Sequence, residues 1–356
     1  EFMDQLYQDQ VGGLGNAEIR AEYYEQIESI FLEPSEYGLS AQINVFFDSL
    51  NEFTTHVEST PARTSVLTEA GALTQSINNT AKRLDDLRTN TNEEIVNFVP
   101  QINSLTERIA QLNEQIVRGE IGTNTANDMR DERGVLLDEL AKIVNIFTRE
   151  KDDGRIDVLV GSDVLIDGNI AEVLEAIPNP ALDPVRNDLV EVRFVRNGQL
   201  ITPSGGELFG ALEMRDVALV KVQTEINTLS ATIIEQLNSI HTQGMGLVNY
   251  TGTRTSSNPV SDPTLALSAA GLPFGVTPGS FDIHVYDEST SPPTPVGGSP
   301  VTINIAAATT MNDLVAQLGA VPNISANVDA NGYLNVTAAA GFSFSNANDS
   351  SNVLAA

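Results

Sequence analysis

The chain has no cysteine and no tryptophan among its 356 residues. Without cysteine it forms no disulfide, no zinc–thiolate site and no thiol nucleophile. Basic residues are also scarce, since 19 Lys and Arg stand against 48 Asp and Glu, giving a formal net charge of −29. This charge argues against binding to nucleic acid or to an anionic membrane surface, because both require basic patches. No stretch approaches the ~20 apolar residues of a membrane span.

Motifs for catalysis and metal binding are also missing from the sequence. The three histidines, His56, His241 and His284, are scattered, and none has a second histidine at metal-ligand spacing. No Gly-x-Ser-x-Gly, Walker or Gly-x-Gly-x-x-Gly motif occurs. Asp152-Asp153-Gly154 and Asp329-Ala330-Asn331-Gly332 resemble parts of calcium loops but lack the closing Glu, so we interpret them as hairpin turns. We therefore predict that the protein is not an enzyme and needs no cofactor or metal.

The clearest positive feature is a stripe of apolar residues in the central helical region, which we call the bundle seam. Its members recur every three or four residues and so share one helix face; they are Ile95, Val99, Ile102, Leu105, Ile109, Leu112 and Ile116. A second copy of the pattern includes Ile226, Leu229, Ile233 and Leu237. Both stripes belong to long predicted helices, so we expect antiparallel packing of residues 95–116 with residues 222–240 in one bundle.

The first ~145 residues have helical periodicity throughout. One helix is predicted over 17–32, ending at Pro34, and a second over 40–57. A third begins at Thr60-Pro61 and ends near 119–122; Pro100 is expected to kink or divide it, because proline removes a helical hydrogen bond. A fourth helix is predicted over 127–143.

From Val144 the apolar period changes to two, which indicates strands. Hairpins are predicted over 146–160, with a turn at Gly154, and over 190–201, with a turn at Asn197-Gly198; a long helix over 208–243 follows. After Arg254 there is no Lys or Arg and only seven acidic residues. That final region predicts a small α+β module joined by a loop over 246–262. Its expected elements are strands 281–285 and 301–305, helix 309–318 with a cap at Thr309 or Thr310, and an Asn-Gly hairpin over 324–336.

These patterns predict an elongated, multi-domain α+β protein. A long-helix bundle is expected over 3–145 and 208–250, with a β-hairpin insertion over 146–207. The β-rich outer module is expected over 251–356, truncated at its C-terminal end. Residues 1–2 have the character of a cloning scar.

The densest charged cluster, Asn127–Arg133, allows two interpretations from its residues alone. Asn or Asp at a helix start can cap free N–H groups, and acids there favour the positive end of the helix dipole. A catalytic pair of carboxylates is the alternative, but no convergent partners are evident in the sequence.

The same cluster, continued into Leu136-Leu137, Leu140 and Val144-Asn145, resembles the Asn-Asp-x-x-Asp-x-Arg…Leu-Leu…Leu…Val-Asn signature of the flagellar hook-associated protein 1 (FlgK) family. The similarity covers about 3–250, although Arg130 and Gly134 depart from the family pattern. Residues 280–354 resemble a small module of several flagellar axial proteins. The residues that match the family signature are Asn127, Asp128, Asp131, Arg133, Leu137, Leu140, Asn238, His241 and Gly244.

The resemblance implies a non-enzymatic adaptor that forms a ring at the hook–filament junction, outside the cell, after export without a cleavable signal peptide. It implies contacts of the full-length protein with hook protein, the second junction protein and neighbouring copies. It further implies that both terminal regions of the family are absent here, including the C-terminal region that an export chaperone needs. The fragment is then expected to be a monomer.

Two other functions remain open from the residues alone. An extracellular binding module or adhesin with a helical stalk would share the long amphipathic helices and the β-rich module. A glycan-acting enzyme is the third possibility, but the sequence offers no site for it.

Overall fold

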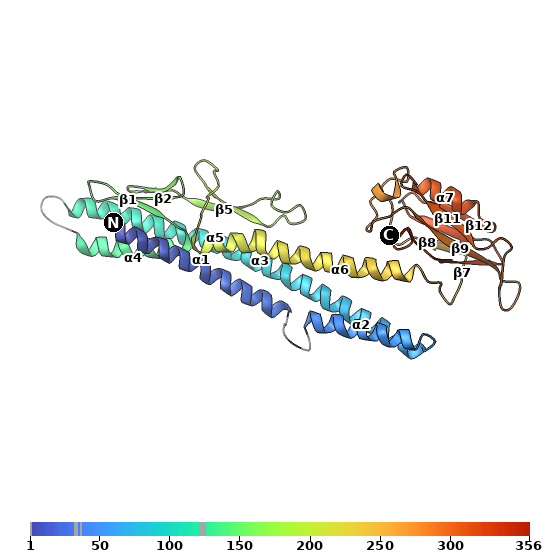
Figure 1. Ribbon diagram of the computed structural model, residues 1–356. Coiled ribbons are helices and arrows are strands. Elements are labelled where there is room, and N and C mark those ends of the chain that lie inside the picture. The colour runs from blue at the N-terminus through green and yellow to red at the C-terminus, as the bar shows by residue number, and fades with distance from the viewer. Residues whose placement is uncertain (1, 32–34, 36–37, 121–125) are drawn as a thin grey trace. The chain divides into compact units, whose positions relative to one another are not determined.

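The structure, a computed structural model, describes residues 2–31, 35, 38–120 and 126–356. They form two compact units, 1–227 and 228–356. The predicted α+β class is confirmed, because long helices occur together with small antiparallel sheets (Figure 1). None of the helices in the described ranges has the length and apolar character that a membrane span requires. The boundary between the two units falls inside a helix, whereas the sequence predicts a domain limit after residue 250. The predicted domain limits therefore stay a prediction.

The helices of the first unit are longer than the sequence pattern suggests. They are α1 (Phe2–Phe31), α2 (Leu39–Thr55), α3 (Thr60–Gly119), α4 (Asn127–Ile143), α5 (Gly206–Glu213), a π-helical turn (Met214–Ala218) and α6 (Leu219–His241), which continues into the second unit.

Helix α1 begins at Phe2, well before the predicted residue 17. The prediction missed this part because Gly12 and Gly15 interrupt the apolar pattern, although the helix continues through them. These glycines allow α1 to approach α4 closely. A Cβ on Gly15 would lie 2.5 Å from the carbonyl oxygen of Lys142. The predicted stop at Pro34 lies outside the described residues.

Helix α3 runs unbroken through Pro100, so the predicted division there is wrong. Pro100 is exposed, and solvent can therefore bind the Val96 carbonyl oxygen that loses its intrahelical partner. Helix α3 begins at Thr60, as the sequence predicts, and its N-terminus is capped by Ser59, whose hydroxyl accepts a hydrogen bond from the Ala62 N–H at 3.3 Å. The helix ends at Gly119, and residues 121–125 of the expected break lie outside the described residues.

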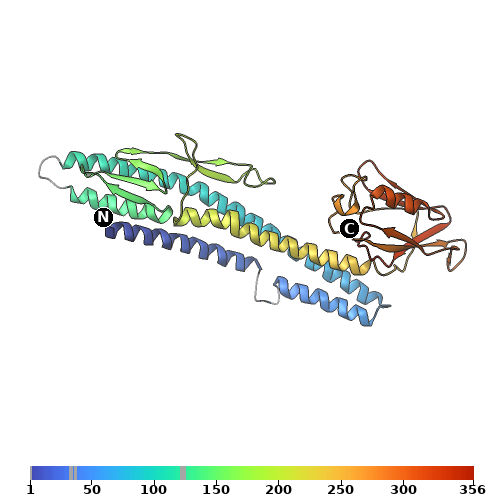
Figure 2. The same cartoon turned by 45° about the horizontal axis from the view of Figure 1, so that its top comes forward.

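A layer of strands lies along one side of these helices (Figure 1, Figure 2). One antiparallel sheet has the order β1-β2-β3-β4, and a second pairs β5 with β6. The predicted hairpin over 146–160 forms, with Gly154 at a φ of 84° in its turn. The predicted hairpin over 190–201 forms around its Asn197-Gly198 turn, with a bridge between Arg193 and Leu200 and a hydrogen bond from the Ile201 N–H to the Val192 carbonyl oxygen. The pairing of β6 with β5 along its length was not predicted. The strands are β1 (Phe147–Glu150), β2 (Ile156–Val160), β3 (Asp163–Asp167), β4 (Ile170–Ala171), β5 (Leu174–Pro178) and β6 (Val190–Phe194).

The second unit packs helix α7 (Met311–Gly319) with two antiparallel sheets. The predicted strands, helix and Asn-Gly hairpin all form, and Thr310 caps α7 in a reciprocal pair with Asp313. The expected loop over 246–262 is wrong in part, since β7 and β8 within it pair with strands about 80 residues away or more. The strands are β7 (Tyr250–Thr251), β8 (Thr253–Thr255), β9 (Gly279–Asp287), β10 (Thr294–Pro295), β11 (Val301–Ile305), β12 (Ile324–Val328), β13 (Leu334–Ala338) and β14 (Phe342–Ala347).

Candidate functional site

The family signature lies mainly on α4, and its central residue is buried. Arg133 is 3% exposed, and its guanidinium donates to the Gly154 carbonyl oxygen at 2.7 Å and to the Asn113 side-chain oxygen at 2.8 Å. Burial lowers the pKa of Arg133 to about 10. A buried cation requires such hydrogen bonds to offset the loss of water. Arg133 therefore joins α4 to the hairpin turn of β1 and β2 and to helix α3.

Asn113 is the common partner in this junction. Its amide nitrogen donates to the carbonyl oxygens of Ile156 at 2.8 Å and Gly168 at 2.5 Å, and its oxygen also accepts from the Ile156 N–H at 3.2 Å. The side chain thus acts on β2 as a neighbouring strand would, by giving and receiving backbone hydrogen bonds. Asn113 is fully buried, so each of these groups depends on the others.

Two further asparagines repeat this arrangement along α3. Asn103 accepts from the Leu174 N–H at 2.9 Å and donates to the Leu174 carbonyl at 2.8 Å. Asn92 accepts from the Val190 N–H at 2.9 Å and donates to the Asp188 carbonyl at 3.0 Å. Intervals of ten or eleven residues are about three helical turns, so the three amides share one face. We call Asn92, Asn103 and Asn113 the asparagine row; it attaches α3 to both sheets of the strand layer.

The start of α4 is stabilised by the side chain of Glu120 and by ion pairs, and not by the side chain of its own N-cap residue. The helix begins at Asn127 with Asp128 in its first turn, as the sequence predicts, but the N-cap residue is Ala126, so the expected cap by an Asn or Asp side chain is wrong. Glu120 supplies the cap instead, accepting from the Ala126 N–H at 3.1 Å and from two nitrogens of Arg130 at 2.7 and 2.8 Å. Arg130 also pairs with Glu150. Arg130, a departure from the family pattern, is thus fully engaged here.

The remaining signature residues occupy different environments. Leu137 and Leu140 are buried, whereas Asn127, Asp128 and Asp131 are exposed on α4. Asn238, His241 and Gly244 lie in the second unit, where Asn238 and His241 contribute to the wall of a pocket. The structure therefore assembles Arg133, Leu137 and Leu140 around one core and leaves the acidic members facing solvent.

The bundle seam is buried on α3 and only partly buried on α6. Ile95, Ile102, Ile109 and Ile116 are fully buried, Val99 and Leu112 are 6% exposed, and Leu105 is half-buried. Of the second stripe, Ile226 is buried, Ile233 and Leu237 are half-buried, and Leu229 is 37% exposed. The main neighbours of α3 are α2, α4, α5 and the strands β3 to β6, and α6 is not among them. Over residues 219–227 the predicted pairing is therefore not formed.

A second buried polar cluster, around Arg215, gave no recognised motif in the sequence. Arg215 is 1% exposed, pairs with Asp216 through two nitrogens at 2.8 Å, and donates to the Val190 carbonyl at 2.7 Å and to Asn92 at 2.8 Å. It lies in the π-helical turn between α5 and α6, where the extra residue changes the direction of the side chains. Arg88 donates to the Arg215 carbonyl and pairs with Asp183 at 2.6 Å.

These clusters direct their polar groups at the protein's own backbone and side chains. Within the described ranges no three or more His, Asp or Glu side chains are placed to hold a metal ion. The only sequence sign of the asparagine row is its interval of three turns beside the apolar seam. The Arg215 cluster joins segments more than 100 residues apart, so its members show no local pattern.

Comparison with known families identifies both parts of the chain. Residues 24–255, more than half of the sequence, match the model of the flagellar hook-associated protein FlgK helical domain. Residues 280–340 match the flagellin hook IN motif.

Curated relatives agree with this assignment. Flagellar hook-associated protein 1 of Salmonella typhimurium is 30% identical over 230 residues, which are 62% of this chain and 41% of that protein. Its counterpart in Bacillus subtilis is 28% identical over 145 residues, covering 41% of this chain and 29% of that protein. These matches span about two fifths or less of the relatives' length.

Among solved structures, the flagellar hook junction protein FlgK from Burkholderia pseudomallei has a similar fold, with a TM-score of 0.56 at 18% sequence identity. The superposition covers 98% of this chain and 63% of that one. With a helical-domain match over residues 24–255, the chain belongs to the FlgK family of flagellar hook-associated proteins.

Proposed function

We propose that this chain is part of a structural adaptor at the junction between hook and filament of a bacterial flagellum, and that it has no catalytic role. The family match and the relatives named flagellar hook-associated protein 1 support this function. The matched region is about two fifths of the length of the Salmonella and Escherichia coli relatives, so the adaptor role belongs to a longer protein.

The observation that carries the proposal is the internal use of the family signature. Arg133, the buried residue of that signature, forms its hydrogen bonds with Asn113 and Gly154 of the same chain. A catalytic arginine would have to reach a substrate, whereas this one is enclosed and holds α4, α3 and a hairpin together. The signature therefore favours a load-transmitting scaffold over a chemical site.

By analogy with the family, we propose that the full-length protein contacts hook protein, the second junction protein and neighbouring copies of itself outside the cell. Most acidic residues are exposed on a chain with a net charge of −29, and identical copies repel one another at low salt. Assembly then requires specific contacts that overcome this repulsion.

Immunogold electron microscopy of the source bacterium tests the function. Antibodies against residues 1–227 should label one narrow zone where hook meets filament, and a deletion strain should release flagellin into the medium and lose both labelling and motility. Labelling over the cell surface in a strain whose deletion mutant still swims would instead support an adhesin. The deletion strain is also the control for antibody specificity.

A further inference from the structure

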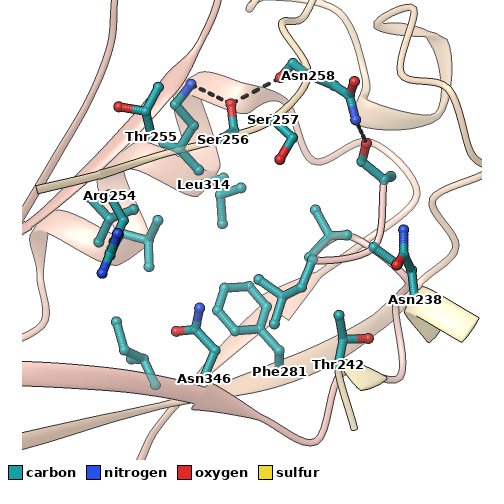
Figure 3. Close-up of a pocket in the computed structure, with 18 of the residues that line it drawn as sticks. Asn238, Thr242, Arg254, Thr255, Ser256, Ser257, Asn258, Phe281, Leu314 and Asn346 are labelled. Carbon is teal, nitrogen blue, oxygen red and sulfur yellow. Dashed lines mark hydrogen bonds between the residues drawn. The ribbon is translucent and has the colours of Figure 1, made fainter. Parts of the chain in front are cut away.

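The second unit contains a pocket of about 500 Å³ between its two sheets, helix α7 and the C-terminal end of α6. Its inner wall is apolar and includes Phe281, Met311, Leu314, Leu318, Val336 and Phe344. Figure 3 shows Phe281 and Leu314 at the cavity, with Arg254 and the segment Thr255–Asn258 at its margin. The volume falls in the range of roughly 300–1,000 Å³ that is typical of small-molecule sites.

Arg254 lies on the cavity side of the strand β8. Its neighbours Thr253 and Thr255 hydrogen-bond through their side chains to Thr337 and Asn335 of β13, which places those side chains on the other face. Because side chains alternate along a strand, Arg254 shares the cavity face with Val336, its partner in the β8–β13 register. Both residues line the pocket.

Arg254 is the one Lys, Arg, Asp or Glu side chain among the residues that line this pocket. Arg254 is the only Lys or Arg in residues 228–356, and no Asp or Glu lines the cavity. The guanidinium carbon lies 4.7 Å from the centre of the Tyr250 ring, and no carboxylate within the described residues forms an ion pair with it. A stacked, unpaired guanidinium at the mouth of an apolar cavity is suited to a carboxylate whose hydrocarbon chain enters the cavity.

We propose that this pocket binds an amphipathic carboxylate, with a saturated fatty acid of medium chain length as the simplest member of the class. The hydrocarbon chain lies among Phe281, Leu314 and Phe344, and the carboxylate pairs with Arg254. The polar segment Ser256–Asn258 borders the same opening. Burial of the chain supplies most of the affinity, and the ion pair selects acids over neutral analogues.

The absence of tryptophan from the chain allows a direct test. In the variant Tyr250→Trp the new indole lies beside Arg254 in the pocket wall and is the only tryptophan emitter. Titration with decanoate and dodecanoate should give a saturable fluorescence change, whereas dodecanol should bind more weakly. Adding Arg254→Gln should weaken dodecanoate binding by roughly fivefold, the upper range for a solvent-open ion pair. Adding Arg118→Gln removes an equal charge from exposed α3 and should change nothing.

A second measurement avoids the reporter substitution. Dodecanoate below its micellar concentration should raise the melting temperature of the unsubstituted chain but not that of the Arg254→Gln variant. The proposal is overturned if neither acid binds, if dodecanol binds as well as dodecanoate, or if Arg254→Gln and Arg118→Gln behave alike.

Discussion

Glu120 is a carboxylate whose ionised form the fold stabilises. Hydrogen bonds from Arg130 and then from the Ala126 N–H lower its pKa from 4.5 to about 2. The folded-state pKa lies below the unfolded one, so this stabilisation is complete above about pH 4.5 and is lost as the pH falls toward 2. We expect Glu120→Gln to lower the free energy of unfolding at neutral pH, and the difference from the parent to shrink through that window.

Denaturant unfolding at several pH values measures this difference. Glu114→Gln, on the exposed surface of α3, is the matched control and should have a small effect. A deficit in Glu120→Gln that stayed constant into strong acid would contradict the account.

Asp138 should show the opposite dependence. Burial against α1 raises its pKa, and Asp4 raises it further, although a hydrogen bond from Gln8 acts the other way. A raised folded-state pKa means that ionised Asp138 destabilises the fold at neutral pH, and that protonation relieves this as the pH falls. Asp138→Asn should therefore stabilise the protein at pH 7 and lose its advantage in acid. Thermal unfolding of this variant beside exposed Glu139→Gln checks the sign; destabilisation at pH 7 would refute it.

At the scale of elements, the asparagine row attaches helix α3 to the strand layer. Asn113→Ala would leave the backbone groups of Ile156 and Gly168 and the side chain of Arg133 without a buried partner. Each orphaned group costs about 1–3 kcal/mol, so we expect the four groups together to cost roughly 4 kcal/mol or more. Asn97→Ala, at an exposed position of the same helix, should change stability by no more than about 0.5 kcal/mol. Equal midpoints in urea for the two variants would show that the row does not stabilise the junction.

The two apolar stripes provide a second comparison between elements. Leu112 on α3 is 6% exposed, and Leu112→Ala should cost roughly 2–5 kcal/mol through lost burial and the cavity left behind. Leu229 on α6 is 37% exposed, so Leu229→Ala should cost less than about 1 kcal/mol. Chemical denaturation of both variants decides the matter. A similar loss at Leu229 would mean that α6 is buried in solution against a partner.

At the scale of the whole molecule, limited proteolysis should cut the chain first just after α6. Residues 244–248 are exposed and include Met245, Leu247 and Val248, but the nearest following tryptic site, Arg254, lies within β8. Thermolysin should therefore cut first at about 244–249, while trypsin spares the segment. Mass spectrometry of the early fragments gives the site. A first cut within 60–118 would contradict the continuity of α3.

The structure moves the expected cut toward the N-terminal end of the predicted loop. Residues 250–255 include the strands β7 and β8. Two further hydrogen bonds hold this region, from the Ala338 N–H to the Gly252 carbonyl oxygen and from the Ser256 N–H to the Leu334 carbonyl oxygen. The predicted monomer is tested separately by measuring the molar mass of the chain by light scattering at low and moderate salt. Both conditions are needed because salt screens the repulsion between acidic copies.

The sequence by itself determined the elements whose information is local. The periodicity of α3 and α4, the turn at Gly154, the Asn-Gly hairpin and the cap at Thr310 all depend on neighbours within a few residues, and the structure contains each of them. The family resemblance also depended on local motifs, and the FlgK match confirms it.

Only the tertiary structure decided how these elements meet. The pairing of β5 with β6, the edge strands β7 and β8, the partners of Arg133 and the Arg215 cluster all involve residues distant in sequence. An apolar stripe indicates that a helix has a buried face, but it does not determine which element packs on that face, because hydrophobic burial is non-directional. The seam of α3 therefore packs on α4, α5 and the strands, where the buried amides of Asn92, Asn103 and Asn113 fix the contact through directional hydrogen bonds.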